Sequence, residues 1–282
     1  MSQTFNPSDI AMLRTDKRAS LTETVQRWKS DGDSVALVPT MGALHEGHLS
    51  LVRLALKAAD RCVVSIFVNP TQFAPHEDFD SYPRDISADL QLLQSAGVDL
   101  VYTPDEADMY PSGKDSAIKA GAAAKGLETD FRPHFFDGVV NVVHRLFDHA
   151  QPDLAVFGEK DYQQLMVIDE MVQAQSLPIE ITGAPIARDA HGLALSSRNA
   201  YLSAEELEIA RMLNQALYKA AQDIQGGADA DAACDEASAL LLNCGFDKVD
   251  YVSYKPEWNR VLIAAHIGKT RLIDNAPTTP ST

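Results

Sequence analysis

The chain is poor in cysteine and has no long apolar run. Its three cysteines, Cys62, Cys234 and Cys244, are scattered and form no CxxC pair, which favours idle thiols in a reducing compartment over a disulfide framework or a cysteine metal site. No apolar run approaches the roughly 20 residues that a membrane span needs. The first twenty residues lack the basic start and apolar block of a signal peptide. We therefore expect a cytoplasmic protein with no membrane partner.

Basic residues are also scarce. Lys and Arg number 24 against 40 Asp and Glu, which gives a formal net charge of -16 over 282 residues. Such a chain repels a phosphate backbone, so nucleic acid is not expected as a partner. Small anionic substrates stay possible, because a local group of Lys and Arg can outweigh the overall field at short range.

What the sequence does contain is an alternation of short apolar runs with longer amphipathic segments. The runs predict strands over residues 34–39, 61–68, 98–104, 152–158 and 177–183. The amphipathic segments predict helices over 47–59, 87–96 and 161–175, with one more that Asp137 caps. Residues 117–131 are left unassigned. Strands that alternate with helices indicate an α/β fold, in which helices cover both faces of a parallel sheet.

The pattern changes after about Arg188. Ser203 and Glu206 have the spacing of a capping box, which predicts a long helix to about residue 225. A second helix over 226–245 and three short strands over 249–254, 260–267 and 270–274 are expected to follow. We therefore expect a large domain over 1–187, a small α+β domain over 188–275, and a disordered tail over 276–282.

Polar segments follow the ends of several predicted strands. They cover residues 40–48, 69–73, 158–164 and 193–203. In an open parallel sheet, ligands bind beyond the carboxyl ends of the strands, and these ends share one edge. The sequence therefore predicts a binding site at that edge.

His45 and His48 lie where the first predicted strand turns into a helix. Such a turn offers backbone N–H groups and the positive end of a helix dipole to a phosphate. Positions three apart share a helix face, so both imidazoles are expected to face the crevice and donate to phosphate oxygens. The alternatives are two surface polar residues or a metal pair, although HEGH lacks the HExxH spacing of a zinc protease.

Other polar residues at this edge are weaker candidates. Lys160 and Asp161 suit a phosphate and a ribose, but could also be a solvated lysine and a capping acid. Arg198 could stabilise charge on a leaving phosphate, or simply belong to a polar turn. Gln72 and Gln164 could hold a carboxylate or hydroxyl, or be solvated amides.

Six segments of the chain together resemble the pantoate–β-alanine ligases. They are PTMGALHEGHLSL, FVNPTQF, YPRD, FGEKDYQQL, GLALSSRN and GKTRLIDN, in the order and spacing of that family over nearly the whole chain. The family belongs to the nucleotidyltransferases that resemble class I aminoacyl-tRNA synthetases, with HEGH as the HIGH motif and LSSR as a KMSKS-like loop. The resemblance implies a Rossmann-type domain, a smaller C-terminal domain that partly lids the site, and a homodimer.

The resemblance also implies the reaction. The carboxylate of (R)-pantoate attacks the α-phosphate of ATP, which is accompanied by Mg²⁺, to give pantoyl adenylate and pyrophosphate. The amine of β-alanine then displaces AMP to give pantothenate. The alternatives are another HIGH-motif nucleotidyltransferase acting on a different acid or phosphorylated acceptor, and an inactive nucleotide-binding module.

Site residues are carried over by position. The resemblance implies catalytic roles for His48, His45, Lys160 and Arg198. It implies ATP binding by Met41, Gly42, Ala43, Leu44, His45, Glu46, Gly47, His48, Gly158, Glu159, Lys160, Asp161, Ala187, Leu195, Ser196, Ser197 and Arg198. It implies substrate binding by Gln72, Gln164, Asn69, Tyr82 and Arg132, and a metal ligand at Asp89. One departure is that Phe135 stands where the family usually has histidine, and His134 precedes it.

Overall fold

The computed structural model describes residues 12–74, 77, 79–115 and 118–279. These residues form two compact units. The first comprises the chain up to Gly158 together with Gln163–Ala184, and the second comprises Glu159–Tyr162 together with the chain from Pro185 onward. The second unit is therefore discontinuous in sequence.

The first unit contains a parallel sheet. Its strands are β1 (Leu13–Thr15), β2 (Val35–Thr40), β3 (Arg61–Ile66), β4 (Leu100–Tyr102), β5 (Leu154–Gly158) and β6 (Glu180–Ala184). They lie in the order β1-β4-β3-β2-β5-β6, and every neighbouring pair is parallel. From β2, strands β3 and β4 are added on one side of the sheet, and strands β5 and β6 are added on the other side. The order therefore reverses between β2 and β5, which is where open sheets of this kind bind ligands.

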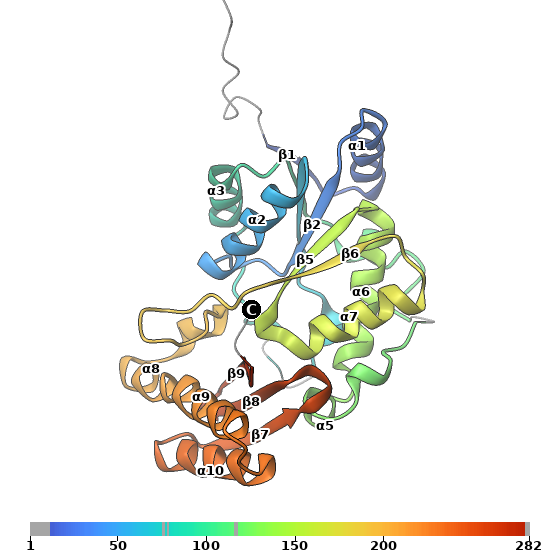
Figure 1. Cartoon of the computed structure of the whole chain (residues 1–282). Helices are drawn as coiled ribbons and strands as arrows, with labels where there is room; N and C mark the ends of the chain where they lie inside the picture. The colour runs from blue at the N-terminus through green and yellow to red at the C-terminus, as the bar shows by residue number, and fades with distance from the viewer. Residues whose placement is uncertain (1–11, 75–76, 78, 116–117, 280–282) are drawn as a thin grey trace, which may run out of the picture. The chain divides into compact units, whose positions relative to one another are not determined.

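Helices cover both faces of this sheet (Figure 1). Helices α2 (Glu46–Ala58) and α3 (Ile86–Ala96) lie on one face, where Val52 and Leu93 pack against Ala36 and Val64 of the strands. Helices α1 (Arg18–Ser30), α6 (Phe135–Ala150) and α7 (Tyr162–Ala174) lie on the other. Burial of a large apolar side chain of this kind contributes about 1.5–3 kcal/mol.

Most predicted elements of this unit are confirmed, including the all-parallel sheet and the stop at Gly97, which is left-handed with φ +85°. Strand β1 and helix α1 were not predicted. The expected cap at Asp137 is wrong, because α6 begins at Phe135 after His134. Asp137 instead accepts from the backbone N–H of Ala120 at 3.1 Å, within the segment that the sequence left unassigned.

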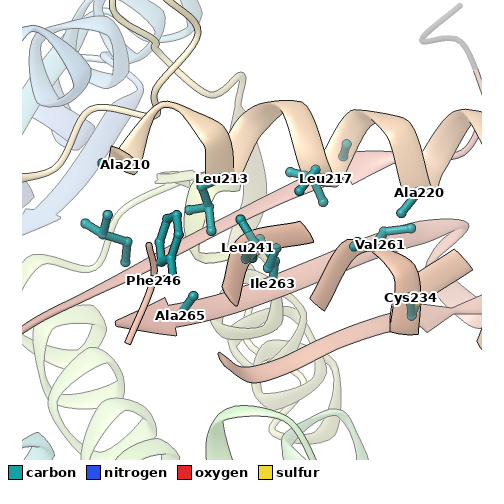
Figure 2. Packing of buried hydrophobic residues seen from close by; sticks show 14 of the residues in the cluster. Ala210, Leu213, Leu217, Ala220, Cys234, Leu241, Phe246, Val261, Ile263 and Ala265 are labelled. Carbon is teal, nitrogen blue, oxygen red and sulfur yellow. The ribbon is translucent and has the colours of Figure 1, made fainter. Parts of the chain in front are cut away.

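The second unit packs two long helices on an antiparallel sheet. Its main elements are α8 (Ala204–Ala210), α9 (Met212–Gln225), α10 (Ala230–Asn243), β7 (Lys248–Lys255), β8 (Arg260–Ile267) and β9 (Thr270–Pro277). Figure 2 shows its core, where Leu213 and Leu217 of α9 and Leu241 of α10 meet Val261 and Ile263 of β8.

Two expectations for this unit are corrected. The capping box of Ser203 and Glu206 is confirmed, but the single long helix is wrong, because it divides at Arg211 into α8 and α9. The tail is ordered further than expected: β9 extends to Pro277, and Thr278 is buried with its N–H donated to the carbonyl of Asn259. Residues 280–282 lie outside the described residues.

Shorter elements connect the larger ones. They are η2 (Pro70–Gln72), α4 (Glu106–Met109), η3 (Ala122–Ala124), α5 (Glu128–Phe131), η4 (Glu159–Asp161), η5 (Ser197–Tyr201) and η6 (Pro256–Trp258). The three cysteines form no disulfide. Within the described ranges, no helix has the length and apolar character that crossing a bilayer requires.

Candidate active site

The loop from β2 to α2 has an unusual backbone. Gly42 and Ala43 are both left-handed, with φ +82° and +51°, and this conformation is costly for a residue with a side chain. A Cβ on Gly42 would lie 2.9 Å from Asp89 Oδ2, so glycine is needed there for space as well as for conformation.

Asp89 of α3 holds this loop in place. Its carboxylate accepts two consecutive backbone N–H groups, from Ala43 at 3.0 Å and from Leu44 at 2.8 Å. The residue is only 3% exposed. Burial raises the pKa of the Asp89 carboxyl, and the N–H groups of Leu44 and Ala43 act against that rise. Asp89 therefore stabilises a loop conformation that is unfavourable for Ala43.

His45 and His48 form a capping box at the start of α2. His45 Nδ1 accepts from the N–H of Gly47 at 3.1 Å, and His48 Nδ1 accepts from the N–H of His45 at 3.3 Å. The two ring centroids are 4.1 Å apart. A ring whose Nδ1 accepts a hydrogen bond carries its proton on Nε2 when neutral. Both imidazoles are therefore held as Nε2–H donors.

These contacts change the chemistry that the sequence suggested for this turn. The backbone N–H groups of Ala43, Leu44, His45 and Gly47 all have partners within the protein. The expected anion site built from backbone amides is therefore largely occupied by the protein itself. The capping contacts orient the side chains of His45 and His48, which the sequence predicts as phosphate ligands.

A cluster of amides follows the next strand. Asn69 is 1% exposed, and its Oδ1 accepts from the N–H and hydroxyl of Thr71 and, at 2.6 Å, from Tyr110. Its Nδ2 donates to Gln72 Oε1 at 3.1 Å, and Gln72 Nε2 lies 3.1 Å from the sulfur of Met41. Asn69 thus orients the Gln72 amide, and Gln72 contacts the β2–α2 loop.

Helix α6 approaches this cluster closely at Gly138. The Gly138 carbonyl accepts from Asn69 Nδ2 at 3.2 Å. A Cβ on Gly138 would lie 2.3 Å from the carbonyl oxygen of Thr71 and 2.9 Å from Gln72 Cα. No side chain fits that space without a shift of backbone, so Gly138 sets the position of the turn that carries Gln72.

Arg132 is committed to contacts within the protein. Its guanidinium donates to both carboxylate oxygens of Glu77, at 2.6 and 2.9 Å, and to the Gln72 carbonyl at 3.3 Å. It lies 3.8 Å from the ring centroid of Phe135. Phe135, the residue that departs from the family pattern, therefore stacks on this arginine. Arg132 in turn holds the backbone of Gln72 through the hydrogen bond to its carbonyl.

Two other predicted substrate residues lie elsewhere in the first unit. Tyr82 is 5% exposed and packs edge-on against Phe73. Gln164 is half-buried on α7. Its neighbour Gln163 was missed by sequence analysis, although it is buried and its amide holds Ala123, Gly126 and Glu128 of the unassigned segment. Long-range contacts of this kind leave no local signal.

In the second unit, the turn that carries Lys160 is fastened to β9. Asn275 Nδ2 donates to the carbonyls of Glu159 and Lys160, at 2.8 and 2.9 Å. The Lys160 ammonium lies 4.0 Å from Asp161 Oδ2, at the outer limit of an ion pair. Its side chain is 20% exposed, so a cation is presented on a fixed backbone.

The remaining predicted ATP residues are also in the second unit. Ala187 and Leu195 are brought together, because the carbonyl of Ala187 accepts the N–H of Leu195 at 2.9 Å. Ser196 caps the turn that carries Arg198, whose N–H it accepts at 3.3 Å. Ser197 and Arg198 lie in η5.

The described residues offer little for a protein-held metal. Among them, no group of three or more His, Cys, Asp or Glu side chains could hold a metal ion. Both oxygens of Asp89 accept backbone N–H groups. The Asp89 carboxylate, which the family resemblance offers as a metal ligand, holds the loop in this structure.

Comparisons with known proteins agree on one family. The family model described as pantoate-beta-alanine ligase matches residues 14–277. The chain is 55% identical over 267 residues to the pantothenate synthetase of Mesorhizobium japonicum, covering 91% of this chain and 94% of that one. It is 51% identical over 269 residues to that of Rhodospirillum rubrum, covering 91% and 95%.

Solved structures agree with this likeness. The structure of pantothenate synthetase from Thermus thermophilus has a TM-score of 0.89 at 39% identity, covering 95% of this chain and 100% of that one. The pantoate-beta-alanine ligase of Francisella tularensis, complexed with beta-gamma ATP and beta-alanine, has a TM-score of 0.85 at 35% identity, covering 95% and 98%.

Proposed function

The chain belongs to the pantoate-beta-alanine ligase family, and on this premise we propose that it joins (R)-pantoate to β-alanine at the expense of ATP. In the first step a pantoate carboxylate oxygen attacks the α-phosphorus, and pyrophosphate leaves. In the second step the β-alanine amine attacks the carbonyl carbon of pantoyl adenylate and loses a proton, while AMP leaves with the electrons of the broken C–O bond.

The observation that carries this proposal is the pair of capping histidines at the carboxyl end of β2. Their capping contacts fix both rings as Nε2–H donors, next to the point where the strand order reverses. Adenylyl transfer needs positioned donors for charge that develops on phosphate oxygens, and it needs no protein nucleophile. His45 and His48 supply such donors, with His48 stabilising the pyrophosphate as it leaves.

The rest of the nucleotide site is proposed from family membership. Lys160 and Arg198 supply cationic donors for the phosphates. Residues 41–48, 158–161, 187 and 195–198 bind ATP, with Asp161 toward the ribose. The support in the structure is that Asn275 fixes the Lys160 turn and Ser196 caps the Arg198 turn.

Pantoate is proposed to bind through the amides of Gln72 and Gln164. Amides hold a carboxylate and a hydroxyl without adding charge that would compete for the attacking oxygen. Asn69 orients Gln72, and Arg132 supports its backbone. Tyr82 is proposed to line the same substrate region.

Mg²⁺ is proposed to enter with ATP, bound to its phosphates as part of the substrate. Among the described residues, no group of three or more His, Cys, Asp or Glu side chains could hold a metal ion, so the phosphates are proposed as the main ligands of this Mg²⁺. We further propose that the protein is a cytoplasmic homodimer, in keeping with the family.

A pyrophosphate-release assay with single omissions tests the proposal. Complete mixtures of ATP, (R)-pantoate and Mg²⁺ should release pyrophosphate and form pantoyl adenylate, and β-alanine should be needed for AMP release and pantothenate. Turnover that persists without pantoate but needs another acid would favour a different HIGH-motif nucleotidyltransferase. ATP binding with no pyrophosphate from any acid would indicate an inactive nucleotide-binding module.

A further inference from the structure

The turn that carries Lys160 has an anchor that no local sequence pattern indicates. Asn275 lies on β9 and is 1% exposed. Its side-chain amide donates both hydrogens to two successive backbone carbonyls, those of Glu159 and Lys160. One amide group thus fixes the peptide planes on either side of the Lys160 Cα.

Arg260 of β8 orients this amide and holds the flanks of the turn. Its Nη1 donates to Asn275 Oδ1, which directs the NH₂ of Asn275 toward the turn. Its Nη2 donates to Glu159 Oε2 at 3.3 Å. Its guanidinium lies 3.9 Å from the ring centroid of Tyr162. The Arg260 side chain, which is 11% exposed, therefore contacts Glu159 before Lys160 and Tyr162 after it.

We propose that Asn275, oriented by Arg260, is a positioning residue for Lys160. The inference rests on the proposed function of Lys160 as a phosphate donor. A flexible lysine side chain delivers its charge to a fixed point only if its backbone is fixed, and a misplacement of about 1 Å can cost roughly 100-fold in rate. Asn275 supplies this restraint from a strand 115 positions away in sequence.

Asn275→Asp tests the inference with almost no change of shape. The carboxylate keeps an acceptor for Arg260, but it turns an oxygen toward two carbonyl oxygens and removes both donors. We expect kcat for pyrophosphate release to fall about 10- to 100-fold, with the KM for pantoate changed less than about twofold. Asn275→Ala removes the two donors without adding repulsion, so it should also lower kcat, by a smaller factor.

Ile263→Val is the matched control for general loss of stability. Ile263 is fully buried in β8, in the core that packs against α9 and α10, and it lies in register with Asp274, the neighbour of Asn275. Side chains alternate between the two faces of a strand. This change therefore weakens the packing of the sheet against the helices and leaves the hydrogen bonds of Asn275 and Arg260 intact. It should lower the melting temperature and keep kcat.

A double-mutant cycle with Lys160→Ala shows whether Asn275 acts through Lys160. If it does, Asn275→Asp should cost less than about twofold in the Lys160→Ala background, since the group that it positions is absent. An equal loss in both backgrounds, or an Asn275→Asp enzyme as active as Ile263→Val, would overturn the inference while leaving the proposed reaction intact.

Hydrogen exchange of the peptide that covers residues 158–163 provides a readout that needs no substrate. Exchange should be faster in Asn275→Asp than in Ile263→Val at matched stability. If the exchange rate of this peptide is the same in both variants, the Asn275 amide does not fix the turn, whatever the activity shows. If wild-type enzyme releases no pyrophosphate with pantoate, the proposed reaction fails instead, and the exchange result still decides whether Asn275 holds the turn.

Discussion

Replacing Asp89 with asparagine should disable the loop that presents His45 and His48. The carboxylate accepts two backbone N–H groups, those of Ala43 and Leu44, in a buried position. Asparagine keeps the shape and one acceptor, but its NH₂ faces one of the two N–H groups. One hydrogen bond to a charged group is lost, which costs roughly 1.5–3 kcal/mol, and two donors are brought together.

The size of the effect follows from the strain that Asp89 offsets. Ala43 is left-handed, which costs about 1 kcal/mol or more for a residue with a side chain. Without its anchor the loop should leave this conformation. A penalty of roughly 2–3 kcal/mol corresponds to roughly a 30- to 150-fold loss in kcat/KM for ATP. The fold should survive, since domains of this kind have about 5–15 kcal/mol of stability.

The assay is pyrophosphate release at varied ATP, with Asp85→Asn as the control. Asp85 caps the same helix, accepting from the N–H of Ala88 at 3.0 Å, and asparagine caps equally well. Asp85→Asn therefore makes the same change of charge four residues before Asp89, and this variant should keep its activity. Melting curves of both variants separate loss of the loop from loss of the fold.

A magnesium titration gives the result that would refute the reasoning. An anchor of backbone N–H groups has no dependence on Mg²⁺, so the loss in Asp89→Asn should be the same at every Mg²⁺ concentration. Recovery of activity as Mg²⁺ rises would mean that Asp89 ligates the metal, as the family resemblance suggested. Unchanged kinetics at all concentrations would mean that the loop needs no anchor.

Three further predictions concern single sites. His48→Ala should slow pantoyl adenylate formation roughly 10²- to 10³-fold; an unchanged single-turnover rate would remove His48 from the first step. Gly138→Ala should destabilise the protein by about 1–3 kcal/mol and raise the KM for pantoate, because its Cβ would lie 2.3 Å from the Thr71 carbonyl oxygen; urea unfolding and pantoate titration measure both, and normal values of both would contradict the close approach. His149 is buried beside the Tyr102 hydroxyl at 3.0 Å, and burial, aided by the charge of Arg18, lowers its pKa to about 4. The unfolded chain, with a pKa near 6.5, binds this proton first as pH falls, so unfolding free energy should drop by about 3 kcal/mol between pH 7 and 4; His149→Gln should lose that part of the pH dependence, and an identical slope in both proteins would refute it.

The parallel sheet could be predicted because its signal is local. Strands β2 and β3 are apolar at nearly every position, and most of their residues are buried. A capping box such as that of Ser203 and Glu206 is also contained within four residues. Patterns of this kind depend only on neighbours in sequence, so they survive without knowledge of tertiary contacts.

The anchors of the site could not be predicted for the opposite reason. Asp89 is 46 positions from Ala43, and in sequence it is an ordinary acid in the first turn of a helix. Asn275 is an asparagine in a strand, and Gln163 is one of two adjacent glutamines. The break of the helix at Arg211 has neither glycine nor proline to mark it. Asp89, Asn275 and Gln163 gain their roles only when distant segments meet.

The second unit takes residues Glu159–Tyr162 from the middle of the first, and this interleaving limits how family members can be recombined. A chimera that joins the first 184 residues of one relative to the remainder of another would pair a foreign Glu159 turn with the Asn275 strand. Such hybrids should be productive only when the donor of the carboxyl-terminal part also donates those four residues. A hybrid that keeps each unit intact therefore alternates four pieces of chain rather than two.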